Sequence, residues 1–202
     1  MKVFDWLDVM KIVGAAIAFY IGLRQYQKAQ VWKRVEFVAS EMKAFDADEA
    51  ARAAMTMLDW SRKKIELYKY RGLDDHDMVI VDYRLVAESL ETDLNKGFDK
   101  AQSAIREVFD EFLGFIERFE SFLEAGVIEQ QDLVPYLHYW TKMLSGNDQN
   151  HPELTKIVLP QFWRFVDFFG YRSVIRFVSR YDRISPDLKP GNAKCSEWEL
   201  AS

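Results

Sequence analysis

The densest cluster of side chains able to bind a metal ion is the run Asp74-Asp75-His76-Asp77. Carboxylates and imidazole are metal ligands, but adjacent residues rarely converge on one ion without ligands from elsewhere in the chain. Runs of Asp and His are also common in exposed turns, where an Asp can cap the helix that follows. We therefore interpret this run as a solvated turn.

The other titratable residues form no recognisable catalytic pattern. The three histidines are far apart in sequence, and HExxH, GxGxxG, GxSxG and phosphate-loop motifs are absent. Glu107, Asp110 and Glu111 are neighbours on a predicted helix, but the inward positions of that helix are Phe instead of the Glu-x-x-His pairs of di-iron bundles. We predict a solvated acidic face, no metal, no cofactor and no catalytic activity.

A third group of charged residues is the stripe of Arg172, Arg176 and Arg180, which recur every four residues among Phe and Tyr side chains. This spacing places the guanidinium groups on one face of a helix. A basic face beside aromatic residues suits contact with an anionic membrane surface. The simpler interpretation, which we prefer, is a solvated basic face over a core of aromatic residues.

The composition indicates one folded domain with an attached helix. The chain has 202 residues, of which 49% are hydrophobic and 29% charged, close to the values of globular proteins. Its net charge of −5 lacks the basic excess that nucleic-acid binding needs, so we predict no nucleic-acid partner. The single cysteine, Cys195, cannot form an internal disulfide, which favours a reducing compartment.

The apolar run from Ile12 to Leu23 is the segment best suited to a membrane. At about 1.5 Å per residue it covers about 18 Å, so a full span of about 30 Å requires extension back to Phe4. This extension adds three charged residues, all toward one end of the span. Trp6 then lies where an interfacial aromatic residue belongs. Three alternatives remain, namely a helix lying in the membrane interface, a buried core helix and a cleaved signal peptide.

Basic residues on one side of this run predict its orientation. Arg24, Lys28, Lys33 and Arg34 follow it closely, and the cytoplasmic flanks of membrane helices are enriched in Lys and Arg. We expect a single-pass protein of the bacterial inner (cytoplasmic) membrane. Its N-terminus is then outside and its C-terminal domain is cytoplasmic.

Small residues recur along one side of the same segment. Gly14, Ala18 and Gly22 are spaced by four, which allows a second helix to approach closely in lipid. Gly and Ala are also simply common in membrane anchors. We predict that these three residues pack against another membrane protein or a second copy of the chain, with membrane lipid around them.

Helical spacing of apolar residues dominates the rest of the chain and predicts an all-α fold. One long helix should continue from the anchor to Phe45, because no Gly or Pro interrupts it after Gly22. The clearest helix runs from Asp99 to Ala125, with a wide Phe-rich stripe and a polar side that includes Glu120. Further helices are predicted at about 132–145, 154–169 and 172–181.

Two segments are harder to assign. Residues 48–65 are rich in Ala and Met and are predicted to be helical after a break near Asp46. Met78–Leu90 begins with residues that suit a strand, but no second strand is evident and Asp77 is a good N-cap, so we predict a helix. The predicted organisation is a membrane anchor at residues 1–24, a cytoplasmic helical bundle at 25–185 and a flexible tail at 186–202.

Four segments carry a resemblance to other proteins. Tyr26–Glu41, Met55–Trp60, Ile105–Phe112 and Pro135–Trp140 resemble segments of an uncharacterised bacterial family of small helical proteins with one N-terminal membrane helix. The resemblance covers most of residues 10–180. It implies the topology described above and no particular activity.

Two classes of function are consistent with these features. The first is a non-catalytic membrane-anchored interaction protein, either an adaptor or an accessory subunit of a larger membrane complex. The alternative is a membrane-tethered sensor or effector that binds a small ligand in its helical bundle. Candidate ligand-binding residues for that alternative are Trp60, Arg62, Tyr136, His138 and Trp140.

Overall fold

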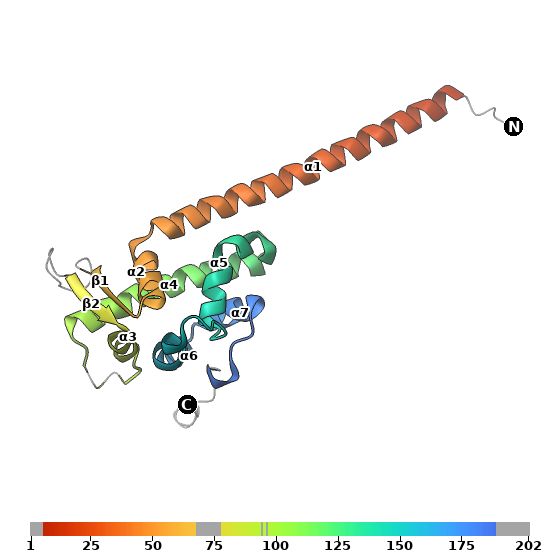
Figure 1. Ribbon diagram of the computed structural model, residues 1–202. Helices are drawn as coiled ribbons and strands as arrows, with labels where there is room; N and C mark the ends of the chain where they lie inside the picture. Colours follow the sequence, from red (N-terminus) through yellow and green to blue (C-terminus); the bar gives the residue numbers. More distant parts are fainter. Residues whose placement is uncertain (1–5, 68–77, 94, 96, 189–202) are drawn as a thin grey trace, which may run out of the picture. The chain divides into compact units, whose positions relative to one another are not determined.

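The computed structural model describes residues 6–67, 78–93, 95 and 97–188. Within these ranges the chain is mostly helical, with seven α-helices and one two-stranded sheet (Figure 1). The predicted all-α class is therefore right in its main feature, with a small hairpin in addition. The run Asp74–Asp77 and most of the predicted tail lie outside the described residues.

The chain divides into two units, Met1–Glu41 and Met42–Ser202. Helix α1 runs from Trp6 to Ala47, which confirms the single long helix predicted as far as Phe45. Among the described residues, no helix has a stretch long and apolar enough to cross a membrane. The span predicted from the sequence begins at Phe4, which lies outside the described residues.

Helix α2 and a β-hairpin open the second unit. Asp48 caps α2 (Glu49–Asp59), because its Oδ1 accepts a hydrogen bond of 2.8 Å from the backbone N–H of Ala51. Strand β1 (Arg62–Glu66) then pairs antiparallel with β2 (Met78–Asp82). The helix predicted to extend to residue 65 therefore ends six residues earlier, at Asp59.

The helix predicted for Met78–Leu90 is wrong in its first part. Met78–Asp82 is a strand, and α3 covers only Tyr83–Ser89. The N-cap is Asp82, whose Oδ1 accepts from the backbone N–H of Leu85 at 2.9 Å. The sequence hides the partner strand because β1 is mostly charged and buries only Ile65 among its five residues.

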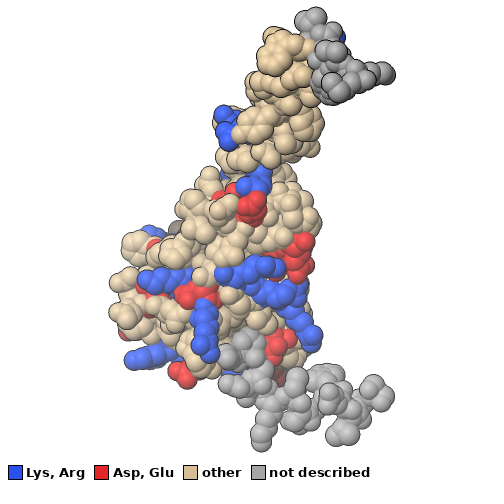
Figure 2. Space-filling view, turned by 90° about the vertical axis from the view of Figure 1, so that its right-hand side faces the viewer, with Lys and Arg blue, Asp and Glu red and all other residues tan. Residues whose placement is uncertain are grey.

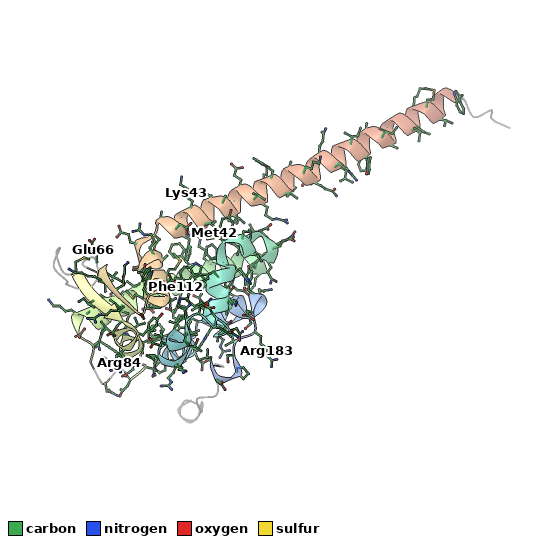
Figure 3. All side chains as sticks on the ribbon, in the orientation of Figure 1. Met42, Lys43, Glu66, Arg84, Phe112 and Arg183 are labelled. Atoms are coloured by element: carbon green, nitrogen blue, oxygen red, sulfur yellow. The ribbon has the colours of Figure 1, made fainter. Side chains whose placement is uncertain are left out.

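Helix α4 (Lys100–Glu124) is the central element of this domain and agrees with the prediction. Asp99 and Gln102 form a capping box, with the backbone N–H of Gln102 donating to Asp99 Oδ1 at 2.7 Å. The helix packs against α2, α3 and α7, so a wide apolar stripe is buried. Phe112 lies in the interior (Figure 3), with its ring centroid 6.2 Å from that of Phe45.

Three further helices complete the domain. They are α5 (Gln130–Leu144), α6 (Leu159–Phe168) and α7 (Arg172–Tyr181). Helix α5 begins earlier than predicted, with Asp132 inside its first turn instead of at the N-cap. A π-helical turn, Leu154–Val158, precedes α6, and a 3₁₀ turn, Pro186–Leu188, follows α7. The three predicted helical regions are otherwise confirmed.

Candidate functional site

A group of basic residues lies along α7. Val174, Phe177 and Val178 face the interior of the domain, whereas Arg172, Arg176 and Arg180 are exposed. The structure therefore places the three predicted arginines on the outward side of one helix. Lys and Arg side chains gather on the side of the domain that carries α7, with Asp and Glu side chains among them (Figure 2).

Arg180 forms an ion pair with Glu120 of α4. Its guanidinium group donates to both carboxylate oxygens of Glu120, with Nε–Oε2 and Nη2–Oε1 distances of 2.9 Å. Glu120 is completely buried, which corrects the prediction that it lies on a solvated face of its helix. The hydrogen bond to Glu120 raises the pKa of the Arg180 guanidinium. This pair fastens α7 to α4.

Arg176 is held next to the same pair. Its Nε lies 3.0 Å from Oε1 of Glu124 and 3.6 Å from Oε1 of Glu120, and its Nη2 donates to Ser173 Oγ at 3.1 Å. These contacts fix the position of a side chain that is still half exposed. The guanidinium group of Arg176 is therefore accessible to solvent, although its contacts hold the side chain in one position.

An open groove of about 590 Å³ lies beside this ion-pair cluster. Arg172 and Arg176 line it, together with Arg183 from the segment after α7. Within the described part of the chain, the guanidinium groups of Arg172 and Arg183 make no ion pair. The remaining lining residues are Asp167, Ile175, Ser179 and Ile184. We call this feature the arginine groove.

Sequence reasoning found two of the three arginines of the groove and named one that is not in it. Arg172, Arg176 and Ser179 follow 4-3 spacing along one face of α7, whereas Arg180 turns toward Glu120. Arg183 lies beyond the end of the helix at Tyr181. The spacing within α7 was a signal available in the sequence, but it does not extend to Arg183. Asp167 and Ile184 had no comparable signal, because only the tertiary fold brings them to the groove.

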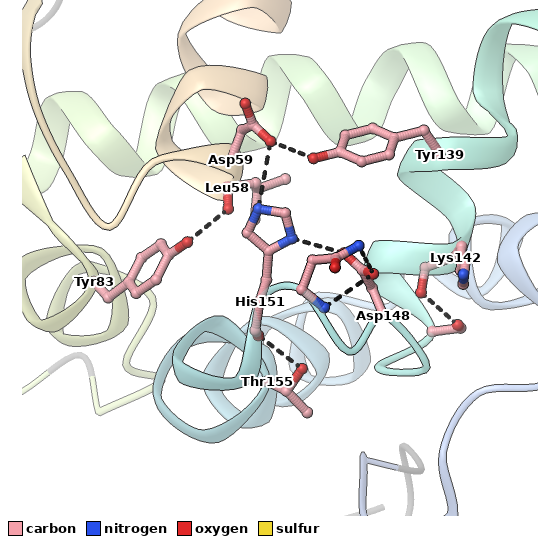
Figure 4. A network of polar contacts seen from close by, with 10 residues as sticks. Leu58, Asp59, Tyr83, Tyr139, Lys142, Asp148, His151 and Thr155 are labelled. Atoms are coloured by element: carbon pink, nitrogen blue, oxygen red, sulfur yellow. Dashed lines mark hydrogen bonds and ion pairs between the residues drawn. The ribbon is translucent and has the colours of Figure 1, made fainter.

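A second polar cluster surrounds His151, at the end of the loop between α5 and α6 (Figure 4). Its Nδ1 lies 2.6 Å from Oδ2 of Asp148, and its Nε2 lies 3.6 Å from Oδ1 of Asp59. The hydroxyl group of Tyr139 donates to the same Oδ1 of Asp59. The cluster therefore links the C-terminal end of α2 to α5 and to the loop that follows it.

Burial affects the titration of two groups in this region. Burial raises the pKa of Asp148, but hydrogen bonds from His151 and from the backbone N–H of Asn150 outweigh this effect and lower the pKa overall. Burial, with the charges of Asp59 and Glu153, raises the pKa of Tyr83 to about 12. The Tyr83 hydroxyl donates to the backbone carbonyl of Leu58 at 3.1 Å.

The His151 cluster is arranged as a structural clamp. In a nucleophilic triad one ring nitrogen of the histidine faces the carboxylate and the other faces the nucleophile. Here both ring nitrogens face carboxylates, those of Asp148 and Asp59. In the described residues, no group of three or more His, Cys, Asp or Glu side chains is arranged to hold a metal ion.

The small-residue stripe of α1 is open on its surface. Gly14, Ala18 and Gly22 are exposed, and a Cβ atom added at Gly14 or at Gly22 would meet nothing within 4 Å. This part of α1 therefore has room for a second helix. That such a helix packs here stays a prediction.

The remaining predicted ligand-binding residues do not meet in one place. Trp60, Arg62, Tyr136 and His138 are exposed and Trp140 is half-buried, and none of these five lines the arginine groove. On α4, Asp110 is exposed and accepts a hydrogen bond of 3.1 Å from the hydroxyl group of Tyr171. Although Asp110 is exposed, the protein around its carboxyl group displaces part of the surrounding water, and this desolvation raises its pKa.

Together these features describe a small helical domain that follows a long N-terminal helix and carries an arginine-lined groove. The chain matches no protein-family model, no curated protein and no solved structure.

Proposed function

We propose that this chain is a non-catalytic, membrane-anchored interaction protein that serves as an adaptor or accessory subunit of a larger membrane complex. The observation that carries the proposal is the exposed apolar surface of α1. Every residue from Ile12 to Leu23 is exposed, including Phe19 at 74% and Ile12 at 63%. Contiguous apolar surface of this kind marks a membrane or protein contact.

The distribution of this apolar surface favours a helix inserted into the membrane over a helix that lies in the membrane interface. A helix that lies in the membrane interface has a charged or polar face that stays in water. The segment Ile12–Leu23 contains no charged residue, so it presents apolar or small side chains on all sides. Surroundings that are apolar on every side, such as lipid with one packed helix, match this surface.

The flanking residues support a direction of insertion. Arg24 and Lys28 follow the apolar segment, and the guanidinium group of Arg24 lies over the ring of Tyr20, 5.3 Å from its centroid. In the proposed arrangement the span begins at Phe4, the N-terminus is outside the bacterial inner membrane, and the domain from Met42 onward is cytoplasmic.

Alkaline extraction of membranes tests the anchor. The full chain should stay in the membrane pellet, and the double variant Ile17→Lys/Ile21→Lys should be released, since each central Lys costs about 3 kcal/mol on insertion. The matched control is Val31→Lys/Val35→Lys, which changes two equally exposed apolar residues beyond the segment. Equal behaviour of the two double variants would refute the anchor.

The interaction part of the proposal rests on the small-residue stripe. Gly14→Ile/Gly22→Ile should remove a helix partner while leaving the domain from Met42 folded, because both positions face open space. The measurement is purification of the full chain in mild detergent from native membranes, with mass spectrometry of the co-purified proteins. A stoichiometric membrane partner lost in the variant supports an accessory subunit.

A second candidate function is a membrane-tethered sensor or effector, and the arginine groove is the observation that favours it. The groove presents two guanidinium groups without ion pairs within the described part of the chain, beside the restrained Arg176. A full chain that purifies without any protein partner would favour this candidate over an adaptor.

A further inference from the structure

We propose that the arginine groove of α7 is a binding site for a phosphoryl anion carried on a partly apolar molecule. The groove of about 590 Å³ has three arginines and one acidic residue, Asp167, among its seven lining residues. Its lining therefore carries a net positive charge, although the whole chain has a net charge of −5.

The charge balance inside the groove depends on which arginines are already paired. Arg176 shares its charge with Glu124 and Glu120. Arg172 and Arg183 make no ion pair within the described part of the chain, so their two charges outweigh the single charge of Asp167. Because arginine stays protonated at physiological pH, this excess does not depend on a titration.

Guanidinium groups select the shape of the anion as well as its charge. Their planar arrangement of N–H donors matches the oxygens of a phosphoryl group, and it binds them through paired, charge-assisted hydrogen bonds. Ser179 adds a hydroxyl group to the lining. Arg176 is restrained by its contacts with Glu124 and Ser173, so it loses less conformational entropy on binding than a free side chain.

The apolar part of the lining indicates what carries the phosphoryl group. Ile175 and Ile184 lie in the same groove, and Ile184 is only 5% exposed. Aliphatic side chains beside guanidinium groups suit a lipid headgroup with its glycerol and first methylene groups, or a soluble phosphate ester with an apolar body. Both sources share the phosphoryl chemistry, and the experiment separates them.

The experiment measures how fast phenylglyoxal modifies each arginine of the full chain in a neutral maltoside detergent, with mass spectrometry at residue level. The additions are chloride at matched ionic strength, inorganic phosphate, or phosphatidic acid mixed into the micelles. At a ligand concentration about ten times Kd, Arg172 and Arg183 should react about tenfold more slowly than in chloride. Arg52 and Arg84 do not line the groove and are the internal controls.

Arg172→Gln distinguishes a built site from independent surface charges. In this variant the protection of Arg183 should be lost, because the two guanidinium groups bind one anion together. The matched variant Arg84→Gln should leave the protection unchanged. Undiminished protection of Arg183 in Arg172→Gln would overturn the proposal.

The two ligand arms give distinct outcomes. Protection by inorganic phosphate supports the site and identifies a soluble phosphate as sufficient. Protection by phosphatidic acid alone supports the site and identifies a lipid headgroup. No protection in either arm overturns the proposal. The phosphate arm needs no membrane, so its result is independent of whether α1 is an anchor.

Discussion

The two units of this chain differ in the exposure of their apolar side chains. From Ile12 to Leu23 the large apolar side chains of α1 are exposed, whereas in α4 residues such as Phe109 and Leu113 are completely buried. The helix α4 has polar residues on one side, so it can face water and a core together. The segment Ile12–Leu23 of α1 has no charged residue on any side. The domain from Met42 onward therefore makes its own core, whereas in the proposed function the apolar surroundings of Ile12–Leu23 come from outside the chain.

The largest expected effect comes from breaking the core. The ring centroid of Phe109 lies 6.4 Å from that of Phe112 and 6.2 Å from that of Phe162, so Phe109→Ala should lower the free energy of unfolding by about 3–5 kcal/mol. Phe19→Ala, in the exposed part of α1, should change it by less than about 0.5 kcal/mol. Urea unfolding in neutral detergent, followed by near-UV circular dichroism, measures both. Similar losses of unfolding free energy in the two variants would contradict the difference in burial between the two units.

A buried charge sharpens the comparison within the domain. Glu120→Gln leaves the Arg180 guanidinium without its ionic partner and should cost about 2–3 kcal/mol. The loss is smaller than for a fully buried pair because the Arg180 side chain is 40% exposed. Glu124→Gln removes the partly exposed partner of Arg176 and should cost less than about 0.5 kcal/mol. The same unfolding measurement applies, and equal costs would contradict the distinct role of Glu120.

The next largest effect on stability is expected at Gly146, in the turn after α5. Gly146 has φ +79°, and a Cβ there would meet Cδ1 of Leu188 and approach Cβ of Ser185 to 3.5 Å. Gly146→Ala should therefore cost about 2 kcal/mol, from the left-handed backbone and the steric conflict together. Gly170 has φ +77° and open space around it, so Gly170→Ala isolates the backbone cost of about 1 kcal/mol. Thermal unfolding should rank the two variants in this order.

The smallest expected effect depends on pH. The pKa of Asp148 is lowered below its ordinary value of 3.8 in the folded state. The unfolded chain therefore binds this proton more readily, and the stability that Asp148 contributes is present above about pH 4 and is lost as the pH falls further.

Asp148→Asn should accordingly cost about 1 kcal/mol at pH 7, where it weakens a charge-assisted contact with His151. Its difference from the unsubstituted chain should shrink as the pH falls below 4. Urea unfolding at both pH values measures this difference. A difference that grows in acid would contradict a lowered pKa of Asp148 in the folded state.

The helical framework could be predicted from local sequence because its signals are local. The stripe of Phe and Leu residues over 100–124 defines α4 without reference to the rest of the chain. The same is true of α7, whose predicted ends at Arg172 and Tyr181 agree with the structure. Helical spacing suffices wherever one helix is amphipathic over several turns. Capping was a weaker signal, since Asp132 lies inside the first turn of α5 instead of at its N-cap.

The contacts that shape the candidate sites could not be predicted in the same way, because their partners are distant in sequence. Arg180 meets Glu120 from 60 residues away, and Tyr139 meets Asp59 from 80 residues away. Glu120 did carry one local signal, since it follows Ile116 by four residues and so continues the apolar stripe. The hairpin was missed because only Ile65 of β1 is buried.

The central claim is that lipid surrounds the first part of α1, and cysteine accessibility tests it most directly. In a Cys195→Ser background, single cysteines are placed at each position from Ile12 to Leu23 and treated with a membrane-impermeant maleimide in intact and opened cells. The account predicts protection at every position in both preparations, whereas a cysteine at Lys28 should react only in opened cells. Labelling that recurs with helical periodicity, or at all positions, would contradict the claim.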